Sequence, residues 1–511
     1  MQHFQSFLFL LFVFVTKILF ATPGSTTGKV YIDSNNNGVF DKGEKGVRNV
    51  CVTNGEEVVL TDKDGEWELE TNESATVFII KPSGYQVPLN SFNSPEYYFK
   101  VDNELNRKDV KTIDFPLVQQ EESETFSALF FGDPQARGMK EVNYVFHDIV
   151  EELIGTNDAS FGVSLGDIVA DDPGLMDDVS QGIAQIGIPW YNVFGNHDND
   201  RNAKTNRERD NTFEHFFGPS TYAFEYGQVA FISINNIYFD KKGKYYPHFT
   251  RKQLTFIKNY LQFVPKDKLV VLMMHAPIIA CDNQEEMYQL IQNREHTFSI
   301  SGHVHEQINV FVDSEMGWQG KATHHHLINA TVCGSWWCGL KDERGIPHAT
   351  MNDGAPNGYS IITFDGNKYS VRFKAARRPA DYQMNIYIPE EIEKDALDTT
   401  KVLVNVFAGS DRSIVEMSVN HDKSWIRMDT VQTVDPACFE MYKKSSFLKI
   451  IVDNQPLDEV FGYAMDYPGI CHHMWKGKLP GGLEPGTYTL TVRTTDMFNQ
   501  IWKENRIFRV K

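Results

Sequence analysis

Positive charge is in short supply in this chain. Its 49 Lys and Arg residues are outnumbered by 68 Asp and Glu residues, which leaves a formal net charge of −19 over 511 residues. A surface of that sign repels polyanions, so we expect no nucleic-acid partner. A small phosphorylated ligand stays compatible with the charge, because bound metal cations can reverse the local field.

Cysteine is also scarce, with six residues scattered along the chain. This distribution is not a disulfide framework. Cys333 and Cys338 flank Gly-Ser-Trp-Trp, and their spacing is not that of the two-residue zinc knuckle, although the two could pair with each other or share a strand region. We therefore expect isolated buried thiols.

Long hydrophobic runs are missing except near the N-terminus, where residues 7–15 are almost wholly apolar. Lys17 shortens this run below a comfortable bilayer-spanning length, and Ala21 offers a small residue for cleavage. The pattern predicts a signal peptide over residues 1–21 and an exported protein, in the periplasm or at the cell surface. The alternative is an uncleaved membrane anchor. After removal of the signal peptide, no transmembrane domain is expected.

The patterning along the chain predicts three domains, as its length allows. Residues 28–117 hold short alternating strand candidates and predict an N-terminal β-sandwich domain. Residues 122–380 alternate between strand and helix, which predicts an α/β core of parallel strands covered by helices. Residues 381–511 return to short strand candidates, among them 447–452, and predict a C-terminal all-β sandwich domain.

The first domain carries an oxygen-rich loop at residues 33–44. Its candidate ligands have the spacing of a twelve-residue calcium loop: Asp33, Asn35, Asn37, Asp41 and Glu44. The flanking residues have strand patterns, so the loop is not an EF-hand. We expect a structural calcium ion here, and the alternative is an Asn- and Gly-rich turn that binds nothing.

Five short motifs follow one another in the middle of the chain, each after an apolar, strand-like run. They are Gly-Asp-Pro-Gln (132–135), Gly-Asp-Ile-Val-Ala-Asp (166–171), Gly-Asn-His-Asp (195–198), Met-Met-His-Ala-Pro (273–277) and Gly-His-Val-His (302–305). Open α/β sheets bind ligands at the carboxyl ends of their strands. The polar residues of all five motifs should therefore converge on one rim of the sheet.

These residues form a mixed set of oxygen and nitrogen donors for two metal ions. Asp167 is the candidate bridge, because one shared anion offsets the repulsion between two cations. The other candidate ligands are Asp133 and His305 for one ion, and Asn196, His275 and His303 for the other. Such a donor set suits Mn, Fe or Zn better than Mg or Ca.

The joint motif set resembles that of the calcineurin-like metallophosphoesterase family over roughly residues 125–374. With its two flanking β regions, the chain is similar to exported bacterial members that carry N- and C-terminal accessory domains. The resemblance implies a core β-sandwich flanked by helices. It also implies hydrolysis of a phosphate ester by a hydroxide that bridges two metal ions, with His197 assisting the leaving group. The carboxylate that orients His197 is left open among Asp171, Asp172 and Asp198.

Two residues depart from the patterns of known relatives. Gln135 stands where histidine is expected; it can ligate through its amide oxygen, but it is a poorer donor than imidazole. It could weaken one metal site, shift its preference towards harder cations, or leave the position to water. Ala170 occupies the position of the tyrosine ligand of purple acid phosphatases, which disfavours a purple ferric enzyme.

Candidate substrate contacts are Arg137, Trp336 and Asn357, each close in sequence to a metal motif or to the turn that follows the last one. Two other functions stay open. The same metal pair could cleave a phosphodiester or a pyrophosphate in place of a monoester. In a different class, the protein could be a pseudoenzyme that binds phosphoryl ligands, a reading that only Gln135 favours.

Overall fold

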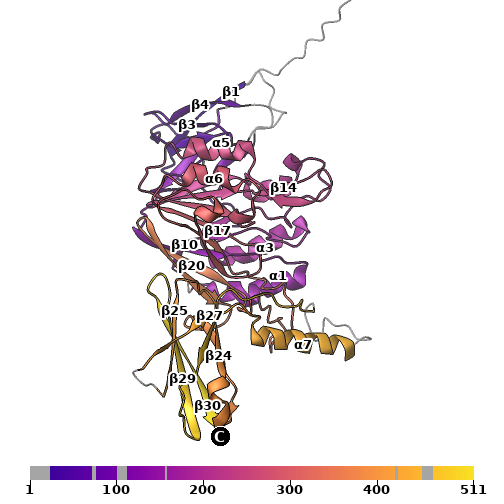
Figure 1. Cartoon of the computed structure of the whole chain (residues 1–511). Helices are drawn as coiled ribbons and strands as arrows, with labels where there is room; N and C mark the ends of the chain where they lie inside the picture. The colour runs from indigo at the N-terminus through magenta and orange to yellow at the C-terminus, as the bar shows by residue number, and fades with distance from the viewer. Residues whose placement is uncertain (1–23, 72–75, 101–111, 156–157, 421–423, 452–463) are drawn as a thin grey trace, which may run out of the picture.

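The computed structural model describes residues 24–71, 76–100, 112–155, 158–420, 424–451 and 464–511 (Figure 1). The predicted signal peptide lies outside these residues. Among the residues described, no helix is long and apolar enough to cross a membrane.

The N-terminal region is a β-sandwich, as the sequence predicts. One sheet has the strand order β4-β1-β8-β6 and the other β3-β2-β5-β7. The strands are β1 (Gly24–Ile32), β2 (Cys51–Thr53), β3 (Val58–Leu60), β4 (Glu66–Thr71), β5 (Thr76–Ile79), β6 (Tyr85–Gln86), β7 (Tyr98–Lys100) and β8 (Phe115–Gln119). In β4, Trp67 and Leu69 are buried while the alternating Glu66, Glu68 and Glu70 are exposed, which is the period-2 pattern of a half-buried strand.

Two larger sheets form the middle of the molecule, with the orders β11-β10-β9-β20-β21 and β12-β13-β16-β17-β19-β18. Their strands are β9 (Thr125–Phe131), β10 (Ala159–Ser164), β11 (Trp190–Asn192), β12 (Tyr222–Tyr226), β13 (Val229–Ile234), β16 (Leu269–Met274), β17 (Thr297–Ser301), β18 (Ile308–Val312), β19 (His324–Ile328), β20 (Gly358–Asp365) and β21 (Lys368–Ala375). The chain pairs β9, β10 and β11 in parallel, and likewise β13, β16, β17 and β19. Every residue of β13 and β16 is buried, as expected of parallel strands covered on both faces.

Helices cover these sheets, and a short hairpin projects from them (Figure 1). The helices are α1 (Met139–Val145), the π-helical turn η1 (Phe146–Val150), α2 (Glu151–Leu153), α3 (Met176–Ile183), α4 (Asn211–Phe217), α5 (Arg251–Tyr260) and α6 (Gln284–Ile291). The 3₁₀ turns are η2 (Pro173–Leu175), η3 (Ala184–Ile186), η4 (Asn206–Glu208), η5 (Ile278–Ala280), η6 (Ser314–Met316) and η7 (Lys394–Thr399). The hairpin joins β14 (Ile237–Phe239) and β15 (Tyr245–Pro247).

The C-terminal region is a second sandwich, with the sheet orders β22-β24-β28-β27 and β23-β30-β29-β25-β26. Its strands are β22 (Met384–Tyr387), β23 (Glu391–Ile392), β24 (Lys401–Val406), β25 (Ile414–Val419), β26 (Ile426–Arg427), β27 (Asp429–Thr430), β28 (Met474–Lys478), β29 (Gly486–Thr495) and β30 (Ile501–Val510). These two sheets confirm the predicted fold class, but the region is not purely β.

The strand predicted at residues 447–452 is wrong as far as the structure describes it, because helix α7 (Pro436–Ile451) runs through this segment. The helix starts at Asp435, whose carboxylate accepts a hydrogen bond from the N–H of Cys438 at 2.9 Å. Pro436 then fits the first turn, where no backbone donor is needed. The apolar residues that suggested a strand are therefore the last turns of a helix that began upstream.

The N-terminal sandwich shares its hydrophobic core with the middle sheets. A single cluster of buried side chains extends from Val30 in β1 to Phe298 in β17. Across the junction, the rings of Phe78 and Phe256 lie 5.8 Å apart and those of Tyr97 and Tyr222 lie 5.4 Å apart. All six cysteines are buried and free, which confirms the expectation of isolated thiols.

Candidate metal centre

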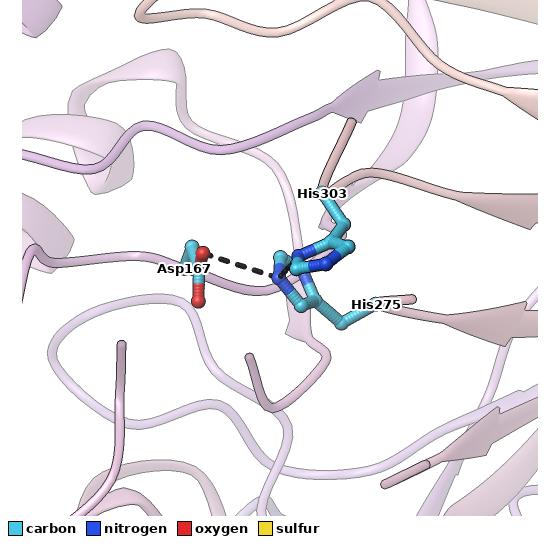
Figure 2. Close-up of side chains that lie close together, drawn as sticks. All are labelled: Asp167, His275 and His303. Atoms are coloured by element: carbon cyan, nitrogen blue, oxygen red, sulfur yellow. Dashed lines mark hydrogen bonds and ion pairs between the residues drawn. The ribbon is translucent and has the colours of Figure 1, made fainter. Parts of the chain in front are cut away.

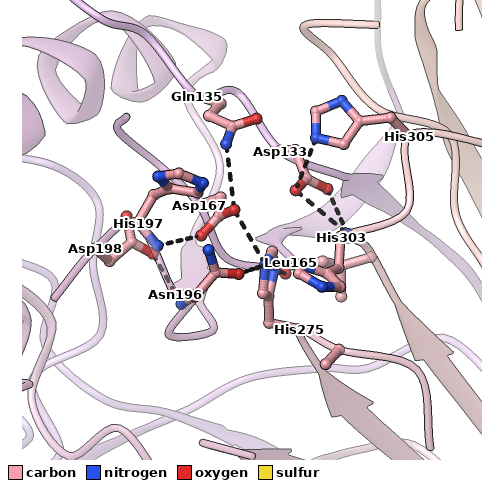
Figure 3. Close-up of polar contacts among 12 residues, drawn as sticks. Asp133, Gln135, Leu165, Asp167, Asn196, His197, Asp198, His275, His303 and His305 are labelled. Carbon is pink, nitrogen blue, oxygen red and sulfur yellow. Dashed lines mark hydrogen bonds and ion pairs between the residues drawn. The ribbon is translucent and has the colours of Figure 1, made fainter. Parts of the chain in front are cut away.

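The five motifs meet at the carboxyl ends of the core strands (Figure 3). Asp133 follows β9, Asp167 follows β10, Asn196 follows β11, and His275 and His303 follow β16 and β17. The predicted convergence on one rim is therefore present. Burial is deep, since the side chains of Asp133 and His275 are fully excluded from solvent.

The backbone of the rim is strained. Six non-glycine residues of the motifs have left-handed φ angles: Asp133 (40°), Gln135 (42°), Asp167 (48°), Asp171 (70°), His303 (77°) and His305 (59°). Such angles cost free energy and persist only where the surrounding structure fixes them, which is common at functional sites. The loops therefore hold their side chains in place at a local conformational cost.

Four acceptor atoms converge around His275 (Figures 2 and 3). Its Nδ1 donates to the carbonyl oxygen of Leu165 at 2.9 Å, so Nε2 is the ring atom that points into the cluster. That Nε2 lies 3.1 Å from each of three further atoms: Asn196 Oδ1, Asp167 Oδ2 and His303 Nδ1. Nitrogen and oxygen ligand atoms gathered within so short a distance are the arrangement that a cation stabilises.

The electrostatics of the cluster favour a positive charge. Burial alone would lower the pKa of His275, but Asp167 and Asp133 outweigh it and raise that pKa to about 9. Burial and His275 together lower the pKa of His303 to about 3, so His303 is a neutral imidazole with a free lone pair. The field that raises the pKa of His275 is the field that attracts a divalent cation.

Asp167 lies at the centre of the set. Its Oδ1 accepts the backbone N–H of His197 at 2.7 Å, and its Oδ2 faces His275 Nε2 at 3.1 Å and Gln135 Nε2 at 3.3 Å. Burial opposes ionisation, but His275 and the N–H of His197 still hold the pKa of Asp167 well below its usual range. Asp167 is therefore a carboxylate at neutral pH, as a bridging ligand must be.

Asp133 and His305 lie on the other side of Asp167. The Asp133 carboxylate accepts the backbone N–H of His303, at 2.9 Å to Oδ2 and 3.2 Å to Oδ1. His305 donates from Nδ1 to the carbonyl of Gly334, so its Nε2 lone pair faces Asp133 Oδ1 at 3.8 Å. This geometry fits a second cation between the carboxylate and the imidazole.

Gln135 is placed as a hydrogen-bond donor to Asp167. Its Nε2 points to Asp167 Oδ2, and its Oε1 accepts from the thiol of Cys333 at 3.6 Å. A half-turn of the amide would bring the oxygen to the same point, so the residue can present either group to the site. Cys333 is a neighbour that the sequence did not assign to the site. Burial, and then Asp133, raise the pKa of its thiol far above the usual value, so it stays a neutral donor.

Of the three candidates, Asp171 is the carboxylate that contacts the ring of His197. Its Oδ1 lies 2.8 Å from His197 Nδ1, and its Oδ2 pairs with the guanidinium of Arg201. His197 Nε2 is then left to act on a bound molecule, and the side chain is 32% exposed. Arg201 lies outside the motif residues that we singled out, although it follows Gly-Asn-His-Asp by only three positions.

The other two carboxylates accept hydrogen bonds from backbone N–H groups. Asp172 Oδ1 accepts from the N–H of Gly174 at 3.1 Å. Asp198, predicted as catalytic, is fully buried and accepts from Gly195 N at 2.9 Å and Val169 N at 3.2 Å. Its carboxylate therefore fixes the loop that carries His197 without contacting the ring.

Among the predicted substrate contacts, only Trp336 borders the rim, with its ring centroid 4.3 Å from that of His305. Arg137 uses its guanidinium to bind Glu141, at 3.0 Å from Nε, and the carbonyl of Trp336. Asn357 is buried and donates to Asp148 Oδ2 at 2.8 Å. Both residues are thus committed to holding neighbouring segments.

The oxygen-rich loop of the first sandwich satisfies its carboxylates from within. Asp33 accepts from the backbone N–H of Gly38 at 2.8 Å, and Glu44 from that of Ser34 at 2.8 Å. Asp41 Oδ2 accepts from the side-chain amides of Asn35 and Asn37 at 2.8 and 2.9 Å. These bonds close the turn, and the calcium ion stays a prediction.

Comparison with known families gives three consecutive matches. Residues 34–120 match the N terminal of calcineurin-like phosphoesterase, residues 126–307 match calcineurin-like phosphoesterase, and residues 326–502 match the C terminal of calcineurin-like phosphoesterase. No curated protein matches the chain. Among solved structures, the chain is similar to purple acid phosphatase PPD1 from yellow lupin (Lupinus luteus) seeds, at 10% identity and a TM-score of 0.36 over 69% of this chain and 67% of that one. A likeness of that size carries no inference about this chain.

Proposed function

Since the chain belongs to the calcineurin-like phosphoesterase family and is a phosphate-ester hydrolase, we propose that it cleaves a small phosphate ester with two divalent cations held at the rim of Figure 3. The observation that carries the proposal is the convergence of ligand atoms of Asp167, Asn196 and His303 on His275 Nε2. Mn, Fe or Zn suit this mixture of imidazole and oxygen donors. When bound, such ions activate water and neutralise charge on a phosphoryl group.

The residues divide between the two cations as the donor geometry suggests. Asp167 would contribute to both sites. Asp133 and His305 would hold one ion, with Gln135 beside them, while Asn196, His275 and His303 would hold the other.

His197 supplies the proton chemistry. Its Nε2 donates a proton to the leaving oxygen, because an alkoxide is a poor leaving group until it is protonated. Asp171 fixes the orientation of the ring through Nδ1. The backbone of His197 is fixed as well, since its N–H donates to Asp167. The imidazole of His197 and the carboxylate of Asp167 are thereby held in a fixed position relative to each other.

The proposal is tested by a metal screen with Mn, Zn, Fe and Mg against p-nitrophenyl phosphate and bis(p-nitrophenyl) phosphate. We expect metal-dependent turnover, a loss of at least about 100-fold in Asp167→Asn, and a loss of about 100-fold or more in His197→Ala. His215→Ala, an exposed histidine of α4, serves as the control and should keep full activity. No turnover with any metal by a folded protein would contradict the proposal.

The same screen separates the alternatives. Preference for the diester would favour the phosphodiesterase or pyrophosphatase reading over monoester cleavage. Metal binding without turnover of either substrate would favour the pseudoenzyme, which the contact between His197 and Asp171 opposes.

We also propose that the protein is exported after cleavage behind Ala21. N-terminal sequencing of protein from fractionated cells should give a chain that starts near Thr22 in an extracytoplasmic fraction. A membrane fraction that retains Met1 would favour the uncleaved anchor instead.

A further inference from the structure

The side chains that border the metal rim indicate which leaving group the substrate carries. This inference rests on the proposed function. A phosphoryl group held at the rim must place its leaving oxygen within reach of His197 Nε2. The rest of the substrate then extends over the partly exposed side chains at the edge of the rim.

Trp336 forms one such border. Its indole lies against the ring of His305 with an interplanar angle of 34°, and it is partly exposed. The backbone of Trp336 has a left-handed φ of 56°, which is unfavourable for a bulky residue. Arg137 donates to the carbonyl of Trp336 and is itself held by Glu141. A strained and clamped backbone thus presents an aromatic face beside a metal-ligand candidate.

Tyr245 forms a second border, on the side of His303. It comes from the β14–β15 hairpin, and its ring stands nearly perpendicular to that of His303 (85°) with centroids 5.8 Å apart. Phe239 in the facing strand supports it, with centroids 6.3 Å apart. Tyr245 is partly exposed.

Two arginines near the rim are already paired with carboxylates. Arg137 binds Glu141, and Arg201 binds the carboxylate of Asp171. Beyond the phosphoryl group, Trp336 and Tyr245 thus offer aromatic surface to a bound substrate. The charges of Arg137 and Arg201 are already balanced by carboxylates. Aromatic side chains bind planar rings of any kind by stacking, which typically changes affinity about 10- to 100-fold per ring.

We propose that the enzyme selects phosphate esters whose leaving group carries a planar aromatic ring, held at the rim by Trp336 and Tyr245. The ring is recognised by its face, so the selection is for planarity and not for apolar character alone. A nucleoside and a simple aryl group both satisfy this chemistry.

Two matched substrate pairs test the proposal. Benzyl phosphate and cyclohexylmethyl phosphate have similar leaving alcohols and ring sizes, but only the first ring is planar. Adenosine 5′-monophosphate and ribose 5-phosphate share the same primary ester and differ by the base. We expect kcat/KM to be about 10-fold or more higher for the aromatic member of each pair.

Variants locate the effect. Trp336→Leu and Tyr245→Leu keep apolar volume but remove the ring, and each should lower the aromatic preference several-fold, while Tyr245→Phe keeps it. Tyr246→Leu is the matched control, because Tyr246 is the next residue of the same strand and packs against Tyr238 and His248. Melting temperature and metal content are measured for every variant. If a leucine variant folds poorly, Ki values of benzylphosphonate and cyclohexylmethylphosphonate on the wild-type enzyme decide the question.

The outcomes separate the two proposals. Equal kcat/KM values within both pairs, or equal Ki values for the two phosphonates, would overturn the aromatic selection while leaving the phosphoesterase intact. An unchanged preference in both leucine variants would overturn the assignment to these residues. Failure to hydrolyse any ester, p-nitrophenyl phosphate included, would instead contradict the proposed function.

Discussion

At the scale of single residues, Asp171 shows how one carboxylate can serve two partners. One oxygen fixes the imidazole of His197, and the other pairs with Arg201. The sequence left three aspartates as candidates for this role, because all three lie within a few residues of a motif. Only the three-dimensional contacts decide among them, and Asp171 reaches His197 from a backbone with a left-handed φ of 70°.

Asp171→Asn should slow the hydrolysis of alkyl phosphates more than that of p-nitrophenyl phosphate. The alkyl leaving group needs the proton of a well-oriented His197, whereas p-nitrophenolate leaves without it. We expect a fall in kcat of about 10- to 100-fold for the alkyl ester and a clearly smaller one for the aryl ester. Asp172→Asn, in the next position, should change neither rate. Equal losses for both esters in Asp171→Asn would contradict an orienting role.

Gln135→His should strengthen the metal site that contains Asp133. Imidazole is a better donor than a neutral amide for Zn and similar cations. Titration calorimetry with Zn should therefore show a lower Kd for one of two sites, while Gln135→Ala should show no gain. An unchanged Kd in the histidine variant would mean that the side chain at position 135 faces Asp167 only as a hydrogen-bond donor.

At the scale of elements, the periodicity of the sequence separated the α/β core from the two flanking β regions, but it did not indicate helices α4 to α7 or the hairpin β14–β15. Alternation between strand and helix is a local property, and it placed the motifs at strand ends correctly. Tyr245 could not be predicted as a site residue, because its approach to His303 joins segments more than fifty residues apart and no motif marks it. Cys333 was missed for the same reason.

Asp210, at the start of helix α4, makes the free energy of unfolding depend on pH. Burial, and then the charge of Glu214, raise the pKa of Asp210 to about 6, although Ser220 donates to its carboxylate. A carboxyl whose pKa is higher in the folded state binds more protons when folded. Its stabilising contribution is therefore fully present below about pH 4 and is lost as the pH rises through about 6.

Asp210→Asn should flatten the pH dependence of unfolding in this window. We expect the wild-type free energy of unfolding to lose roughly 1–2 kcal/mol more than that of the variant between pH 4 and pH 6.5. Urea unfolding at several pH values measures it. If the free energy of unfolding changes equally with pH in both proteins, Asp210 is not the source of this pH dependence.

At the scale of the whole molecule, the C-terminal sandwich contacts the loop that carries His303 and His305. Asp353 Oδ2 accepts from the backbone N–H of Gln307 at 2.7 Å and from His473 Nε2 at 2.9 Å. Both side chains of this ion pair are buried. His473 lies just before β28, so the second sandwich helps to hold the metal-ligand loop.

His473→Asn should weaken metal binding without any change in the ligands themselves. The loss of the imidazolium leaves a buried carboxylate without its charge partner, and the Gln307 backbone loses a firm acceptor. We expect a roughly tenfold higher Kd for Zn or Mn. Arg412→Ala removes a different contact of the same sandwich, to Thr323 and the face of Phe311, and should leave the Kd unchanged. Equal losses in the two variants would point to general loosening of the interface.

The continuous core between the N-terminal sandwich and the middle sheets has a consequence for how the protein can be produced. Phe256 and Tyr222 are buried against side chains of that sandwich. A chain shortened to begin at residue 122 would turn this surface towards water and should aggregate on expression. The sandwich is thus a third layer of the hydrolase, and proteolytic removal of it would not release an active enzyme.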